Sequence, residues 1–203
     1  MKKNILIIVQ CIVLCIVINS CKKSDSGKDG DATKDTICEG NGGKSWLPLA
    51  VHNQWKYTIE SLNLEPKLTV INSTVENSKT YWVIRDSTGL MQLGDLYLRE
   101  DPKSHNLYAL DLNSSSGEFL YLPASPELNQ SWMYFTHLLK VTNLAATYST
   151  STCSYSDLLE VSVYDGISII DKHYYKKGLG LVGTESCGAM TGILFKLNAV
   201  KLY

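Results

Sequence analysis

The chain has 203 residues, with 19 Lys or Arg against 20 Asp or Glu, so its formal net charge at pH 7 is −1. This balance argues against a nucleic-acid-binding protein, because such proteins concentrate positive charge on one face. The length suits one domain with a substantial core, and one domain is the simpler interpretation.

The first twenty residues are predicted to be an export signal. Lys2 and Lys3 precede an apolar run over residues 5–18 that only Gln10 interrupts. The run is too short for a good membrane span and leads directly into polar residues, which is typical of a secretory signal. Since Lys2 and Lys3 are the only charged residues in this segment, the remainder carries 17 Lys or Arg against 20 Asp or Glu, a net charge of about −3.

The end of this signal contains a modification motif. Ile18, Asn19 and Ser20 lead directly into Cys21, which resembles the lipobox of bacterial lipoproteins, although small or apolar residues are commoner at the position of Asn19. In that family the Cys becomes the mature N-terminus and carries a diacylglycerol and an acyl chain, which together anchor firmly. The resemblance implies lipidation at Cys21 and a bacterial cell-envelope location, anchored in the outer membrane. The alternative is an ordinary cleaved signal that contains a Cys.

Residues 21–45 are predicted to be a flexible tether. They consist mainly of Lys, Asp, Ser and Gly, with Ile37 as the only large aliphatic side chain, so they bury too little apolar surface to offset the entropy of ordering. Residues 42–45 read GGKS, like the end of a phosphate-binding loop. However, Cys38 stands where that motif needs its first Gly, and no apolar strand precedes it. We therefore expect no nucleotide here.

Residues 46–203 are predicted to form one antiparallel β domain. Short aliphatic and aromatic runs are separated by Gly, Pro, Asn, Asp and Ser, which is typical of many strands joined by tight turns. The predicted strands cover residues 54–60, 67–72, 80–85, 95–100, 106–112, 118–122, 132–136, 157–164, 167–176, 181–185 and 193–202. Residues 137–146 accommodate one short helix. The predicted fold class is mainly β, as a curved sheet, half-barrel or sandwich with at most one short helix.

Two stretches of this domain carry a family resemblance. Residues 47–57 read LPLAVHNQWKY and residues 174–182 read YYKKGLGLV. They resemble the patterns LPLxVGNxWxY and YYxKGVGLV of uncharacterised secreted proteins and lipoproteins of Bacteroidetes-type bacteria, with His52 in place of the first Gly and Leu179 in place of Val. The resemblance implies a curved antiparallel sheet or half-barrel and supplies no activity.

Residues 178–183 match the GxGxxG pattern letter for letter, yet the context differs from that of a dinucleotide site. Such a site needs a helix starting inside the motif and an acidic residue about 20 positions later. Here no helical pattern follows, and no Asp or Glu comes after Glu185. A glycine turn between two strands explains the motif better, so we expect neither a nucleotide nor another cofactor.

Three cysteines, Cys38, Cys153 and Cys187, remain for pairing after export and lipidation. If tight hairpins join the last strands, Cys153 lies about 26 Å along its strand from the position that faces Cys187. A disulfide needs Cα atoms within about 7 Å. We therefore predict a Cys38–Cys187 disulfide and a free Cys153.

The spacing of reactive side chains indicates neither catalysis nor a metal site. The four histidines form no HxH or HExxH pair, and no Ser stands in a GxSxG elbow. Carboxylates such as Glu100 and Glu118 form a hydrolytic pair only if the fold brings two of them together.

Aromatic side chains are the strongest indication of binding. The four Trp residues are predicted to belong to the core. Tyr81, Tyr97 and Tyr108 alternate with stronger apolar neighbours and are the predicted ligand-contact aromatics on an exposed face.

These features predict a non-enzymatic, lipid-anchored envelope protein whose β domain binds a partner protein, a glycan or an apolar ligand. One alternative is an envelope hydrolase with a site assembled across strands, and another is a structural subunit of an envelope assembly. Two carboxylates or several histidines in one deep pocket would favour the hydrolase. An aromatic groove without titratable groups would favour binding.

Overall fold

The computed structural model describes residues 37–88, 95–112, 117–187 and 194–203. The chain separates into two units, residues 1–32 and 33–203, and all described residues belong to the second unit, the β domain. The predicted export signal, Cys21 and the first part of the predicted tether lie outside the described residues. Within the described part, no helix has the length and hydropathy needed to cross a membrane.

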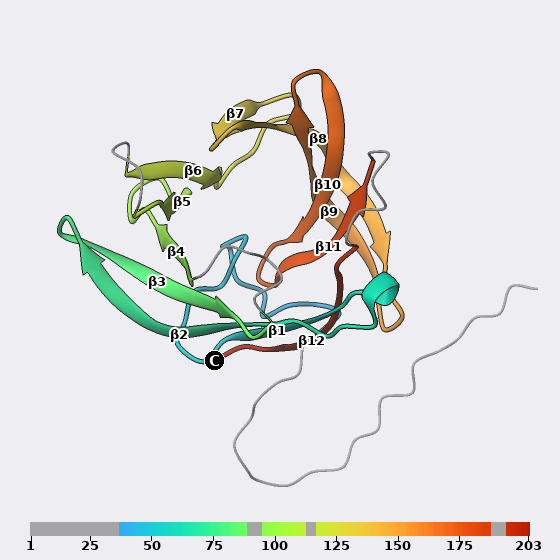
Figure 1. Cartoon of the computed structure of the whole chain (residues 1–203), viewed down its shortest axis with the longest axis horizontal. Coiled ribbons are helices and arrows are strands. Elements are labelled where there is room, and N and C mark those ends of the chain that lie inside the picture. The colour runs from blue at the N-terminus through green and yellow to red at the C-terminus, as the bar shows by residue number, and fades with distance from the viewer. Residues whose placement is uncertain (1–36, 89–94, 113–116, 188–193) are drawn as a thin grey trace, which may run out of the picture. The chain divides into compact units, whose positions relative to one another are not determined.

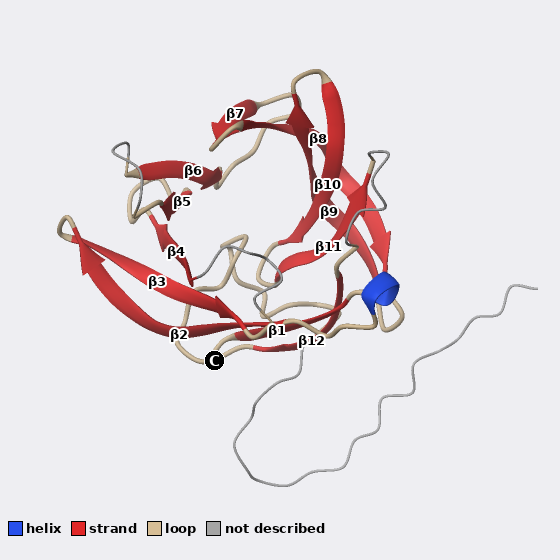
Figure 2. Cartoon of the chain, viewed as in Figure 1, coloured by secondary structure: helices blue, strands red, loops and turns tan. Residues whose placement is uncertain are grey.

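The β domain consists almost entirely of strands, as predicted (Figure 2). The strands are β1 (Gln54–Thr58), β2 (Lys67–Glu76), β3 (Lys79–Asp86), β4 (Asp95–Glu100), β5 (Leu107–Leu110), β6 (Glu118–Leu122), β7 (Ser131–Tyr134), β8 (His137–Ser149), β9 (Ser154–Asp165), β10 (Ser168–Lys176), β11 (Gly180–Ser186) and β12 (Lys196–Lys201). Among the described residues, the only helix is one turn of 3-10 helix, η1 (Glu60–Leu62). Every run predicted as a strand overlaps one of these strands, so the mainly β class is confirmed.

All the strands belong to one antiparallel sheet with the order β6-β5-β4-β3-β2-β1-β12-β11-β10-β9-β8-β7. Neighbours in this order are also neighbours in the chain, except where β1 pairs with β12. That pair, with Trp55 opposite Val200, joins the two halves of the sheet. The sheet curls into a nearly closed barrel in which β6 and β7 are the two edge strands (Figure 1).

Aromatic rings bridge the gap between β6 and β7, and we term this contact the β6–β7 seam. No ladder pairs these two strands within the described residues. The rings of Tyr121 and Tyr134 meet edge to face with centroids 5.7 Å apart, and those of Phe119 and Phe135 lie 4.7 Å apart. Aromatic pairs contribute about 0.5–1.5 kcal/mol each beyond the area they bury. Side-chain packing therefore continues the barrel where backbone pairing stops.

Strand β8 is the element that the sequence did not reveal. Residues 137–146, which accommodate a short helix by pattern, instead form the first part of a 13-residue strand paired with β9. The pairing shifts in register after Val141, after Asn143 and after Ala146. The first two shifts each insert an extra residue in β8 and so change which face the following residues point to, whereas the third inserts one in β9. The strict two-residue alternation that marks a strand is therefore lost over residues 137–146.

The two stretches that carry the family resemblance pack against each other. The indole N–H of Trp55 donates to the Leu179 carbonyl, and the Tyr57 hydroxyl donates to the Leu181 carbonyl at 3.0 Å. At Gly180, where φ is +109°, an added Cβ would lie 2.9 Å from Leu47 Cδ1 and 3.0 Å from Trp55 Nε1. A side chain at this position would collide with both groups, so glycine is required. We term these six residues the Trp55 junction.

The end of the predicted tether, residues 37–45, packs against the strands. The Tyr155 hydroxyl donates to the Ile37 carbonyl at 2.9 Å. The Asn41 N–H donates to the Gly178 carbonyl at 3.1 Å, and the Gly178 N–H donates to the Ser45 carbonyl at 2.8 Å. The end of the predicted tether is therefore held against the β10–β11 turn by backbone hydrogen bonds, despite its polar composition.

The predicted Cys38–Cys187 disulfide is wrong. Cys38 is bonded to Cys153, with Cα atoms 5.5 Å apart, and Cys187 is a free, exposed thiol. The segment that contains Cys38 packs beside the β10–β11 turn, close to where β9 begins. Cys187 follows the opposite end of β11, and its N–H donates to the Ile170 carbonyl. The length of β11, about 20 Å at 3.3 Å per residue, therefore separates Cys38 from Cys187.

Removing the disulfide should destabilise the domain. We expect Cys153→Ser to lower the free energy of unfolding by about 2–4 kcal/mol, because the bond links positions separated by 115 residues. Urea denaturation without reductant measures this change. The matched variant Cys187→Ser removes an exposed free thiol and should change stability by less than about 0.5 kcal/mol. Equal destabilisation by both variants, or a non-reducing peptide map linking Cys38 to Cys187, would contradict the pairing.

Candidate ligand-binding site

The barrel encloses a cavity of about 320 Å³. Side chains from every strand except β5 and β12 line it, and most of them are aliphatic or aromatic. The lining residues are Leu47, Trp55, Tyr57, Leu68, Ile84, Leu96, Tyr121, Tyr134, His137, Leu139, Val163, Ile170, Asp171, His173, Tyr175, Leu181, Thr184 and Phe195. Small-molecule pockets have volumes of about 300–1,000 Å³ and mostly apolar walls. This cavity is therefore the strongest candidate site in the described part of the chain.

The Trp55 junction forms part of the cavity wall. Trp55 and Tyr57 are each only 1% exposed, and their N–H and O–H groups are already bonded to backbone carbonyls. Because these donors are satisfied within the protein, this part of the wall offers a ligand the apolar surfaces of the rings.

Polar side chains enter the cavity mainly from β10. Asp171, His173 and Tyr175 alternate with Lys172 and Tyr174, so the first three share the inward face of the strand. The Tyr175 hydroxyl and His173 Nδ1 lie 3.5 Å apart, the outer limit of a hydrogen bond. We term Asp171, His173 and Tyr175 the β10 polar stripe.

The environment keeps His173 neutral. Burial lowers the pKa of its imidazole below the ordinary value of 6.5, and the nearby Asp171 carboxylate opposes this effect only in part. A neutral imidazole has one N–H donor and one ring nitrogen that accepts. His173 therefore offers the cavity hydrogen-bonding capacity without a positive charge.

A second imidazole comes from the start of β8. His137 lines the cavity, and its Nδ1 is shielded from solvent without a hydrogen-bond partner among the described residues. Leaving a buried polar atom unpaired costs about 1–3 kcal/mol, and such atoms are rare in folded proteins.

Tyr121, Tyr134 and Tyr175 contribute phenol rings to the cavity. Burial raises the pKa of all three phenols, so they stay neutral. Tyr121 and Tyr134 are also the ring pair of the β6–β7 seam. One wall of the cavity is therefore the place where the barrel is joined by side chains only.

The predicted ligand-contact aromatics do not line this cavity. In β4, successive side chains alternate between faces, so Leu96 lines the cavity and Tyr97 lies on the outer face. The pairing of β4 with β3 and β5 places Tyr81 and Tyr108 on that same outer face. Tyr81 is only 1% exposed, so the prediction that it lies on an exposed face is wrong. Tyr97 and Tyr108 are partly buried.

A charged network on the outer face explains why Tyr81 is buried. The Arg99 guanidinium donates to both carboxylate oxygens of Glu118 and lies 4.7 Å from the centroid of the Tyr108 ring. The Tyr81 hydroxyl donates to Glu118 at 2.6 Å. Burial tends to raise the pKa of Glu118, but hydrogen bonds from Arg99, Lys79 and Tyr81 outweigh it and lower this pKa to about 2. The outer face is therefore occupied by internally paired groups.

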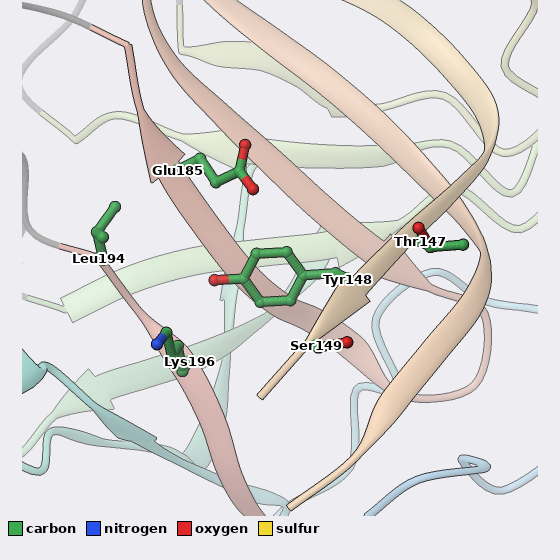
Figure 3. Close-up of a pocket in the computed structure, with 6 residues that line it drawn as sticks. All are labelled: Thr147, Tyr148, Ser149, Glu185, Leu194 and Lys196. Carbon is green, nitrogen blue, oxygen red and sulfur yellow. The ribbon is translucent and has the colours of Figure 1, made fainter. Parts of the chain in front are cut away.

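A second hollow, of about 290 Å³, lies on the outer face of β8, β11 and β12 (Figure 3). Its wall consists of Thr147, Tyr148, Ser149, Glu185, Leu194 and Lys196. Glu185 accepts a hydrogen bond from Tyr174, and Lys196 pairs with Glu60. Because its charged groups are engaged and Leu194 is its only aliphatic residue, this hollow offers a ligand less than the cavity does.

The titratable groups of the cavity match neither pattern in full, because the described aromatic wall is not free of titratable groups and yet holds no carboxylate pair. The described wall contains the two imidazoles of His137 and His173 but a single carboxylate, that of Asp171. Hydrolysis by a carboxylate pair needs two such groups. Among the described residues, no three His, Cys, Asp or Glu side chains are placed to hold a metal ion.

The sequence analysis did not identify the β10 polar stripe, although Asp171, His173 and Tyr175 recur at the two-residue period of one strand face. The residues between them, Lys172 and Tyr174, are also polar, so the pattern did not show which face is buried.

Comparison of the chain with protein-family models, curated proteins and solved structures finds no match.

The buried imidazole should make stability depend on pH. Because the pKa of His173 is lowered in the folded state, the unfolded chain binds more protons below pH 6.5, and the free energy of unfolding should decrease as the pH falls below that value. The His173→Gln variant should show a weaker dependence of the free energy of unfolding on pH, as measured by urea denaturation at pH values around and below 6.5. The matched variant His52→Gln, at an exposed position, should retain it. Identical pH dependence in wild type and His173→Gln would contradict the assignment.

Proposed function

We propose that the β domain binds an apolar small molecule inside its barrel and acts as a non-enzymatic binding module. The observation that carries this proposal is the cavity of about 320 Å³, whose wall is dominated by aliphatic and aromatic side chains. Transferring apolar surface from water to such a wall contributes about 25 cal/mol per Å². A ligand of matching shape would therefore be held mainly by the hydrophobic effect.

An apolar ligand fits this site better than a glycan. Sugar recognition needs many free hydrogen-bonding groups beside an exposed aromatic platform. The polar atoms of Trp55 and Tyr57 are bonded to backbone carbonyls, and the outer Tyr81 is tied to Glu118. These three aromatic side chains are therefore engaged within the protein, and the rest of the cavity wall is mostly apolar.

The proposal includes export and anchoring through Cys21. The basic and apolar pattern before this residue supports an export signal, and the Cys38–Cys153 disulfide is of the kind that persists in oxidising compartments. In this setting the domain would hold an apolar molecule beside the bacterial outer membrane. A hydrolase has weaker support, because the described cavity wall holds one carboxylate.

Ligand binding can be tested with the chain lacking residues 1–21, since every strand, the core and the disulfide lie in the unit of residues 33–203. The neutral fluorophore N-phenyl-1-naphthylamine should gain fluorescence on binding. Ile170→Trp places extra volume in the cavity and should weaken binding by at least about tenfold. Ile167→Trp, at a 99% exposed position on the same hairpin, should bind as the wild type does.

Two results would contradict the proposed binding. One is no change in fluorescence with the wild-type domain. The other is equal binding by the Ile170→Trp and Ile167→Trp variants, with circular dichroism showing that both are folded.

Anchoring is tested separately in bacteria that express the full chain. Cys21→Ala should abolish both fatty-acid labelling and recovery in the membrane fraction, because the acyl chains supply the attachment. The variant Cys187→Ser should remain labelled and membrane-bound. Retention of the Cys21→Ala variant in the membrane pellet would contradict lipid anchoring.

A further inference from the structure

We infer that the ligand of the barrel carries no negative charge and presents a hydrogen-bond donor, such as an alcohol or amine group, to Asp171 of the β10 polar stripe. This inference rests on the proposed function, since it names the chemical class of the molecule that the same cavity binds. It follows from the charges in the wall and from the acceptor that Asp171 provides.

The described wall of the cavity contains one acidic residue, Asp171, and no Lys or Arg. The adjacent Lys172 belongs to the opposite face of β10, and its ammonium pairs with Glu160 at 3.2 Å. A carboxylate or phosphate in the cavity would therefore meet a like charge without a compensating cation. Repulsion between like charges is strong where water is excluded, so the wall disfavours anionic ligands.

Asp171 gives the wall an acceptor with no donor of its own. A carboxylate only accepts hydrogen bonds, whereas the neutral imidazoles and phenols of the same wall can donate as well as accept. A hydroxyl or ammonium group on the ligand would supply a donor to this carboxylate.

Aromatic rings of Tyr121, Tyr134, Tyr175 and Trp55 also line the cavity. They add apolar surface and no positive charge, so none of them would compensate an anionic group on the ligand.

Two fluorophores with the same ring system test this inference on the domain of residues 22–203. N-phenyl-1-naphthylamine is neutral, and 8-anilinonaphthalene-1-sulfonate adds one negative charge. We expect the neutral fluorophore to bind at least about tenfold more tightly. Decan-1-ol and decylamine should displace it, and decanoate, which has the same chain length, should be at least about tenfold weaker.

The Asp171→Asn variant tests the role of the carboxylate itself. It keeps the shape of the side chain and removes the charge, so the preference for the neutral over the anionic fluorophore should fall by about threefold or more. This ratio is insensitive to a general loss of binding. The matched variant Asp165→Asn, at an exposed position on the β9–β10 hairpin, should keep the wild-type ratio.

The outcomes separate this inference from the proposed function. If the wild-type domain binds both fluorophores equally, or if decanoate competes as well as decan-1-ol, apolar binding stands and the inferred ligand class is wrong. If the Asp171→Asn variant keeps the wild-type preference for the neutral over the anionic fluorophore, Asp171 does not determine that preference. If neither fluorophore binds, the proposed function fails and the inferred ligand class fails with it.

Discussion

The packing of Trp55 against the turn between β10 and β11 is the constraint on which the rest of the barrel depends. The indole reaches from β1 past β12 to the Leu179 carbonyl, and Gly180 provides the space because it has no Cβ. This contact ties β1 to the β10–β11 turn across β12, at the place where the two halves of the sheet meet. An aliphatic side chain in place of Trp55 would lose both the buried ring and the hydrogen bond to Leu179.

The cavity follows from this closure. A barrel of about eight strands is just filled by its own side chains, and wider barrels enclose space. The present sheet has twelve strands, so inward side chains from opposite walls leave a volume between them. On the side away from the Trp55 junction, the rings of Tyr121 and Tyr134 join the edge strands. The same aromatic residues therefore complete the barrel and form the surface offered to a ligand.

The two faces of the sheet have different chemistry. On the outer face, Arg99 and Glu118 are paired with each other and with neighbouring side chains, so their charges stabilise the arrangement of β3 to β6. On the inner face, Asp171 has no Lys or Arg beside it in the described wall of the cavity. The outer face therefore neutralises its charges within the protein, and the inner face does not.

The sequence by itself determined where most strands lie and that a glycine turn at Gly178 joins two of them, because alternation and turn chemistry are local properties. It did not determine β8, in which two inserted residues interrupt the alternation. Nor did it determine that Tyr97 faces outward, that Asp171 faces inward or that Cys38 bonds to Cys153. Only the tertiary structure decided these features, because each depends on strand pairing and curvature between residues far apart in the chain.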